Sequence, residues 1–157
     1  MNQEPRFISH EPLRFEEKEI ISRSEELHHF AEKRRSIRQF SDRDIPFEVI
    51  RNIIMTANTA PSGAHKQPWT FCVIRSQELK QKIRIAAEKE EKESYEHRMS
   101  DRWLKDLEPF GTDWRKPFIE TVPWIIVVFK RAFEFENGEK HQNYYVNESV
   151  GIACGML

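Results

Sequence analysis

The hydrophobic residues of this chain follow two spacings, one typical of helices and one typical of strands. From residue 46 to 57 apolar residues recur every three to four positions, and Pro46 suits the first turn of a helix. The apolar face of that helix consists of Val49, Ile50, Ile53, Ile54 and Ala57. β-branched and aromatic residues predict a strand at 70–75. The continuous apolar run at 124–129 predicts a second strand, buried at the centre of a sheet.

The first helix of the chain is marked by a capping box, in which a hydroxyl residue precedes a carboxylate by three positions. The sequence Ser22-Arg23-Ser24-Glu25 has this form. We therefore expect a helix from about Ser22 to Arg35, with its apolar residues facing inward. Those residues are Leu27, Phe30 and Ala31. Residues 1–20 contain prolines and are irregular in pattern, so we expect them to form an arm.

Polar and turn-forming residues predict the remaining elements. Ser76 can cap a long helix at 77–96, whose second half is almost entirely charged. A short helix is expected around 103–107, a turn at Asn137-Gly138, and a final helix from about Asn143. The alternation of helices and strands predicts an α+β fold, with a sheet flanked by helices.

The length suits one domain, which we place at 21–157, after the arm at 1–20. Residues 152–157 have the character of the middle of an apolar helix and carry no capping signal. We therefore expect the domain to be incomplete at its C-terminus, with part of the site beyond Leu157.

Composition narrows the possible functions. Hydrophobic residues make up 38% of the chain, charged residues 32%, and the formal net charge is -1. This balance gives no reason to expect nucleic acid or a membrane as a partner. Cys72 and Cys154 lie in apolar segments without a paired motif, which indicates reduced core residues of a cytoplasmic protein. The histidines show no metal-ligand spacing with cysteines or carboxylates, so no metal site is expected.

Two short segments carry the strongest chemical signal. Arg34-Arg35-Ser36-Ile37-Arg38 places three guanidinium groups and a hydroxyl within five residues, and guanidinium groups suit phosphates. Residues 60–69, Ala-Pro-Ser-Gly-Ala-His-Lys-Gln-Pro-Trp, form a loop whose backbone N–H groups can approach a flat ligand. A solvated basic helix end would explain the first segment by itself, and an ordinary turn could explain the second. Together they predict a site for an anion joined to a ring, as in flavin mononucleotide (FMN).

Both segments resemble the flavin-binding signatures of the FMN-dependent nitroreductase superfamily, and within it those of the iodotyrosine deiodinase family. The resemblance runs from about Ile21 to Leu157 and is most specific at 59–71. It implies a nitroreductase-like mixed sheet flanked by helices, in an intertwined homodimer with FMN at the interface. It assigns the phosphate and ribityl chain to Arg34, Arg35 and Ser36, and the pyrimidine edge of the ring to Arg38. It further implies hydrogen bonds to the flavin from Ser62 and Gly63, with Ala64 facing the substrate.

Three further residues distinguish the deiodinases from other members of the superfamily. Glu91 and Tyr95 are four positions apart and therefore share one helix face. By resemblance, Glu91, Tyr95 and Lys116 form a lid that binds the amino-acid part of the substrate. A carboxylate suits an ammonium group, an ammonium suits a carboxylate, and together they complement a zwitterion. Glu91 alone could belong to a solvated charged face, because it lies within a run of charged residues.

The resemblance implies that reduced FMN removes halogen from a halogenated tyrosine or related phenolic amino acid. The electrons would come from NAD(P)H, directly or through a reductase. Three alternatives remain at this point. The protein could be a general NAD(P)H-dependent FMN nitroreductase that acts on flat aromatics, or a non-catalytic protein that binds flavin or halotyrosine. A chain that lacks its C-terminal strands could also have no activity by itself.

Overall fold

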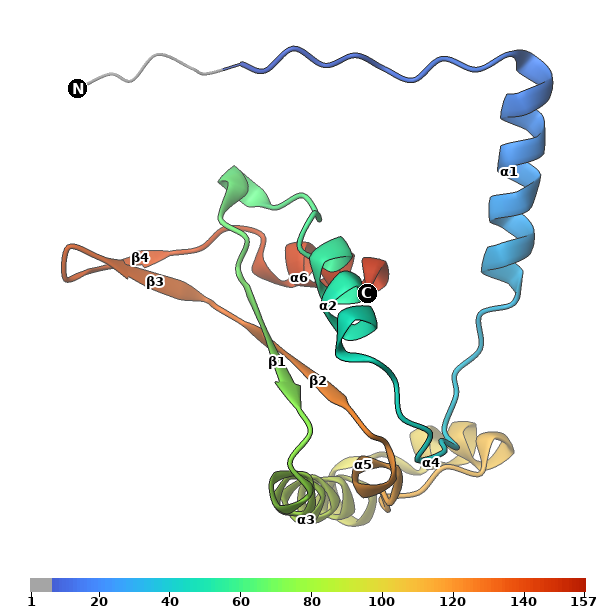
Figure 1. Ribbon diagram of the computed structural model, residues 1–157. Helices are drawn as coiled ribbons and strands as arrows, with labels where there is room; N and C mark the ends of the chain where they lie inside the picture. The colour runs from blue at the N-terminus through green and yellow to red at the C-terminus, as the bar shows by residue number, and fades with distance from the viewer. Residues whose placement is uncertain (1–6) are drawn as a thin grey trace. The chain divides into compact units, whose positions relative to one another are not determined.

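The computed structural model describes residues 7–157, and the chain divides into two compact units with the boundary between Ile37 and Arg38 (Figure 1). In the first unit, residues 7–16 form no helix or strand, as expected for the predicted arm, but residues 17–20, which were also assigned to the arm, are helical. Residues 1–6 of that arm lie outside the described residues.

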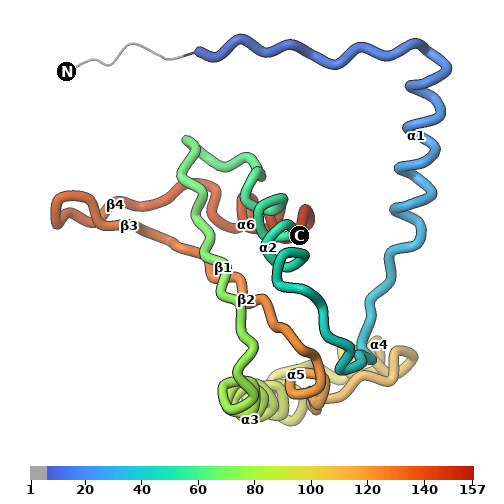
Figure 2. The backbone as a smooth tube through the Cα atoms, viewed as in Figure 1, coloured from blue at the N-terminus to red at the C-terminus, as the bar shows by residue number. Residues whose placement is uncertain are grey.

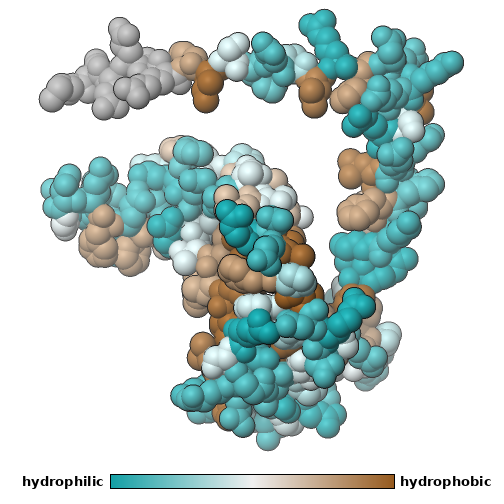
Figure 3. All heavy atoms as spheres, in the orientation of Figure 1, coloured by the Kyte–Doolittle hydropathy of each residue, from teal (hydrophilic) through white to brown (hydrophobic). Residues whose placement is uncertain are grey.

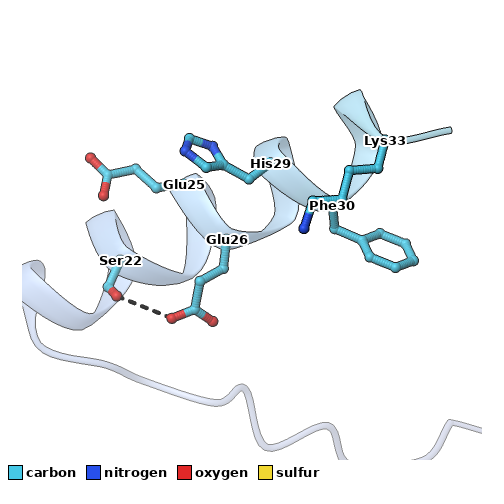
Figure 4. A pocket seen from close by; sticks show the side chains of 6 residues that line it. All are labelled: Ser22, Glu25, Glu26, His29, Phe30 and Lys33. Atoms are coloured by element: carbon cyan, nitrogen blue, oxygen red, sulfur yellow. Dashed lines mark hydrogen bonds between the residues drawn. The ribbon is translucent and has the colours of Figure 1, made fainter.

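In its described part, residues 7–37, the first unit contains one helix, α1 (Glu17–Glu32). The helix begins five residues before the predicted capping box, so that prediction was wrong. Ser22 lies within the helix, and its hydroxyl donates a hydrogen bond of 3.3 Å to Glu26 (Figure 4). Glu17 and Glu19 instead occupy the first turn, where carboxylates favour the helix dipole.

The apolar face of α1 is exposed. Leu27 is 68% exposed and Phe30 is 76% exposed, so the expectation that they face inward is not met in the described unit. A shallow surface depression runs along the same helix (Figure 4). Its lining residues are Ser22, Glu25, Glu26, His29, Phe30 and Lys33. Because all of them are exposed and come from α1 and its C-cap residue Lys33, the depression does not enclose a ligand.

The second unit contains the remaining helices and strands. Its helices are α2 (Phe47–Ala57), α3 (Gln77–Glu93), α4 (Asp101–Leu107), α5 (Phe118–Thr121) and α6 (Val146–Met156). Its strands are β1 (Trp69–Ile74), β2 (Ile125–Lys130), β3 (Phe133–Glu136) and β4 (Glu139–Gln142). A π-helical turn, Ser94–Arg98, follows α3 directly. The backbone trace in Figure 2 shows the same order.

The strands form two antiparallel pairs. β1 pairs with β2 in a register that runs from Trp69 opposite Lys130 to Ile74 opposite Ile125. β3 pairs with β4 across the predicted turn, where Asn137 and Gly138 have φ angles of 52° and 84°. In the part of the chain that the structure describes, β2 is half-buried and pairs with β1 alone, so its prediction as a central strand is not met there. The α+β class is confirmed.

The core of the second unit lies between the β1–β2 pair and the helices α2 and α6. Ala60, Trp69 and Ala153 are buried together, and Phe71 and Val128 pack against them. Figure 3 shows hydrophobic side chains gathered around α2 and the β1–β2 pair. Cys154 is exposed, so the prediction that it is a core residue was wrong, whereas Cys72 is half-buried.

The N-terminal half of α3 is attached to the rest of the second unit. The Ser76 hydroxyl accepts a hydrogen bond from the Leu79 N–H at 3.3 Å, which confirms the predicted cap. Lys80 is 4% exposed and donates hydrogen bonds to the backbone carbonyls of Glu120 at 3.3 Å and Val122 at 2.7 Å. These contacts join α3 to α5 and the turn before β2. Among residues 7–157, no helix combines the length and apolar character needed to cross a membrane.

Candidate active site

The loop between α2 and β1 has an unusual backbone. Ala64, His65 and Gln67 have φ angles of 48°, 55° and 44°, which are uncommon for residues other than glycine. The Ser62 hydroxyl oxygen accepts a hydrogen bond from the Gln67 N–H at 2.9 Å, which closes the loop on itself. Such backbone conformations persist where surrounding contacts hold them, and they cluster at ligand sites. The loop is therefore a preformed element that holds the small, exposed Ala64.

Gly63 lies close to the backbone at the start of α6. A Cβ atom at this position would be 2.8 Å from Tyr145 Cδ2 and 3.0 Å from the Tyr144 carbonyl oxygen. The Gly63 N–H donates to the Ser149 hydroxyl at 3.4 Å, and Ser149 itself is buried. Glycine is therefore required here by protein packing, independently of any cofactor.

The basic segment lies at the boundary between the two units. Arg34, Arg35 and Ser36 follow α1 and are exposed, and the Arg35 guanidinium donates to the backbone carbonyls of Glu32 and Arg34. Arg38 belongs to the second unit, where its guanidinium lies 6.0 Å from the centroid of the Phe110 ring. Because the first three residues and the 62–64 loop belong to different units, their predicted meeting around one cofactor stays a prediction.

The second unit brings two of the three predicted lid residues, Glu91 and Lys116, into contact. The Lys116 ammonium lies 3.4 Å from the Glu91 carboxylate, although the two residues come from different elements. Tyr95 is in the π-helical turn directly after α3, and its hydroxyl donates to Thr112 Oγ1 at 3.3 Å. The Lys116 ammonium also donates to the Asp113 carbonyl at 2.7 Å. The contacts from Glu91 and Tyr95 thus hold the segment 112–116 against the C-terminal end of α3.

A charged network lies beside this ion pair and was not predicted. Glu88 accepts hydrogen bonds from the Arg84 guanidinium and from the Lys116 backbone N–H, both at 2.7 Å. Arg84 also donates to Glu120 at 3.2 Å. The hydrogen bond from Arg84, followed by that from the Lys116 N–H, lowers the pKa of the Glu88 carboxyl below its usual value.

A signal for this network was present in the sequence. Arg84 and Glu88 are four positions apart, and Glu88 and Glu91 are three apart, so all three share a helix face. The run of charge around them is also typical of a solvated face, which is why the pairing with the 112–116 segment could not be read from it.

Comparisons with known proteins agree with the two sequence segments. The model of the nitroreductase family matches residues 31–157. The iodotyrosine deiodinase of Haliscomenobacter hydrossis is 58% identical over 158 residues, which cover 100% of this chain and 71% of that protein. Iodotyrosine deiodinase 1 of Homo sapiens is 46% identical over 144 residues, which cover 91% of this chain and 50% of that protein. The chain therefore spans only about half the length of this animal relative.

A solved structure with the same fold carries both a flavin and a halotyrosine. It is the crystal structure of oxidized iodotyrosine deiodinase bound to FMN and 3-iodo-L-tyrosine. It matches with a TM-score of 0.71 and 32% identity, over 83% of this chain and 65% of that one. With the family model matching most of the chain and the bacterial relative 58% identical, the chain belongs to the nitroreductase family, within its iodotyrosine deiodinase group.

Proposed function

We propose that the protein is an FMN-dependent enzyme that removes halogen reductively from halogenated tyrosines. The observation that carries this proposal is the meeting of Glu91 and Lys116 at 3.4 Å, with Tyr95 in the turn that follows α3 and bonded to Thr112 of the same segment as Lys116. A carboxylate and an ammonium so close together can bind the two ends of an amino-acid zwitterion. A general nitroreductase that accepts flat aromatics has no need for this pair.

The residues assigned to the cofactor fit FMN by their chemistry. Arg34 and Arg35 are exposed guanidinium groups, whose forked donors match a phosphate. The Ser62 oxygen already accepts the Gln67 N–H, so its own hydroxyl proton is available to donate to an acceptor atom of a ring. When bound, reduced FMN supplies the two electrons that, with a proton, replace a carbon–halogen bond by a carbon–hydrogen bond and release halide.

The protein side chains contribute binding, orientation and exclusion of water. The Glu91 carboxylate accepts hydrogen bonds from the substrate ammonium, and the Lys116 ammonium donates to the substrate carboxylate. The Tyr95 hydroxyl adds a further hydrogen bond. Ala64 is small and exposed on its loop, so a phenol ring can approach the cofactor closely there. Closure of the 112–116 segment over the substrate would exclude water, which strengthens each of these charged contacts.

The proposal extends to partners and location. The electron donor is NAD(P)H, directly or through a reductase, and the active form is a homodimer. A cytoplasmic location fits two free cysteines, Cys72 and Cys154, because thiols stay reduced there.

The experiment that tests the proposal uses the full-length protein loaded with FMN. Dithionite reduces the flavin, and iodide release is measured from 3-iodotyrosine and, separately, from 2-iodophenol. We expect release from 3-iodotyrosine over repeated turnovers and little from 2-iodophenol. Equal turnover of both compounds would favour the general nitroreductase. Binding of 3-iodotyrosine without any release of iodide would favour a non-catalytic binding protein.

A further inference from the structure

The backbone of Lys116 is held by a side chain that does not belong to the predicted lid. One oxygen of the Glu88 carboxylate, Oε1, accepts the Lys116 N–H at 2.7 Å. The Glu88 side chain is 17% exposed, and the Lys116 side chain is 22% exposed. This contact joins residues 28 positions apart and ties the backbone of the 112–116 segment to α3, beside the Lys116–Glu91 ion pair and the Tyr95–Thr112 hydrogen bond.

The Glu88 carboxylate is itself held in place. Arg84, one helical turn earlier, donates to the same oxygen from Nε at 2.7 Å. The other arm of that guanidinium reaches Glu120 of α5 at 3.2 Å. A guanidinium bonded to two carboxylates has little freedom to rotate, so it holds Glu88 in the position from which it accepts the Lys116 N–H.

We infer that Glu88 is a positioning residue for substrate recognition, and that it acts by fixing the Lys116 backbone so that the ammonium lies opposite Glu91. The inference rests on the proposed function, because it assigns Lys116 to the substrate carboxylate. Arg84 supports Glu88 in this role. Neither residue needs to touch the substrate.

The geometry separates this role from general stabilisation of the fold. Without Glu88 the Lys116 ammonium would keep its contacts with Glu91 and the Asp113 carbonyl, but its backbone would lose its anchor on α3. The distance between the Glu91 and Lys116 charges would then vary, which lowers the binding affinity of a ligand that must contact both. The binding affinity of a ligand without the amino-acid group would not change.

A double-mutant cycle on the FMN-loaded full-length protein tests the inference. The variants are Glu88→Ala, Glu88→Gln, Lys116→Gln and the combination of Glu88→Ala with Lys116→Gln. Glu93→Ala, an exposed carboxylate on the same helix, is the matched control. Quenching of flavin fluorescence reports the affinity for 3-iodotyrosine and for 2-iodophenol, and hydrogen exchange reports the protection of the Lys116 amide.

We expect Glu88→Ala to weaken 3-iodotyrosine binding by roughly 5- to 30-fold, because a part-buried N–H loses its charged acceptor. Binding of FMN and of 2-iodophenol should change by less than about twofold, and Lys116 amide protection should fall. In the Lys116→Gln background the same substitution should change 3-iodotyrosine affinity by less than about twofold. Glu88→Gln keeps an acceptor oxygen but not the charge for Arg84, so it should have a smaller effect, and it serves as the test if Glu88→Ala does not fold.

Two results would overturn the inference. One is an equal loss of 3-iodotyrosine affinity in both backgrounds, and the other is a parallel loss of FMN affinity, since each indicates a purely structural role. If the parent protein does not prefer 3-iodotyrosine to 2-iodophenol, the proposed function fails and the inference with it. If the parent shows that preference and the cycle shows no coupling, the inference alone fails.

Discussion

Neutralising either charge of the Glu91–Lys116 pair should separate substrate binding from stability. Glu91→Gln and Lys116→Gln keep the size and much of the hydrogen-bonding capacity of each side chain while removing its charge. In the structure the Glu91 side chain is 41% exposed and the Lys116 side chain is 22% exposed. An ion pair this exposed contributes only about 0–1 kcal/mol to folding. Each variant should therefore remain folded, with a free energy of unfolding close to that of the parent.

The effect on the substrate should be much larger. In the closed complex each end of the zwitterion lies against one counter-charge with water excluded, so the loss of one charge leaves its partner unpaired. Truncating one member of a desolvated charge pair costs about 2–5 kcal/mol. That range corresponds to roughly 30- to 5,000-fold in affinity. FMN affinity should hardly change, because the lid residues are not assigned to the phosphate or ribityl chain.

A single fluorescence titration can measure these effects. Quenching of the flavin by 3-iodotyrosine and by 2-iodophenol is followed for the parent, for each variant and for Lys105→Gln. Lys105 is an exposed lysine on α4 and controls for the loss of a positive charge. We expect strong loss of 3-iodotyrosine binding in the two lid variants, and no change in 2-iodophenol binding or in the control.

The reasoning would be refuted if the parent bound 2-iodophenol as tightly as 3-iodotyrosine, since the amino-acid group would then contribute nothing. It would also be refuted if Lys116→Gln and Lys105→Gln weakened 3-iodotyrosine binding equally, because the effect would then reflect overall charge. If FMN affinity fell in parallel with 3-iodotyrosine affinity, the lid residues would have to be assigned to the cofactor site.

Other substitutions test the basic segment, the loop between α2 and β1, and the N-terminal half of α3. Arg34→Ala should weaken FMN binding by about 1.5–3 kcal/mol through loss of a charge-assisted contact, and unchanged FMN affinity by calorimetry would remove that residue from the phosphate site. Gly63→Ala should destabilise the protein by about 0.5–2 kcal/mol in urea denaturation. The crowding of a new Cβ against the Tyr144 carbonyl at 3.0 Å exceeds the gain from a stiffer unfolded chain, and a stabilised variant would contradict this. Lys80→Met should cost about 1–3 kcal/mol by leaving two carbonyl groups without donors, whereas Lys82→Met, at an exposed i,i+4 pair, should cost less than about 0.5 kcal/mol.

Much of the local structure could be predicted because it depends on nearby residues. The α2 helix and the Ser76 cap follow from spacings of a few positions, and both were confirmed, whereas Pro46 lies at the N-cap, one residue before the first turn in which it was predicted. The long helix was predicted to continue to Glu96, but its α-helical part ends at Glu93 and continues as a π-helical turn. One inserted residue in a helix leaves no mark on charge or propensity, so this change could not be read from the sequence.

The site was predicted unevenly for the same reason. Helical spacing alone placed Glu91 and Tyr95 on one face, but the partnership with Lys116 came from the family resemblance, because it joins two separate elements. Glu88 was missed since its partner is a backbone N–H, and backbone groups carry no signal in a sequence. The positions of Arg34 to Ser36 relative to the 62–64 loop depend on how two units meet, which local patterns do not determine.

In the proposed lid, the pairing of Glu91 with Lys116 would let a polar segment select an amino-acid substrate. Without a substrate, the two side chains compensate each other's charge. Because an exposed ion pair is weak, separating the two charges to bind a substrate would cost little free energy. A zwitterion can replace each counter-charge with one of its own, so both charges remain compensated inside the closed site. A neutral halophenol offers no counter-charge to either side chain, so it gains none of the charged contacts that the zwitterion would gain on closure. In this proposal, discrimination comes from contacts that only the zwitterion makes, and it requires that the two lid charges be held at the separation of its ammonium and carboxylate groups, which is the role proposed for Glu88.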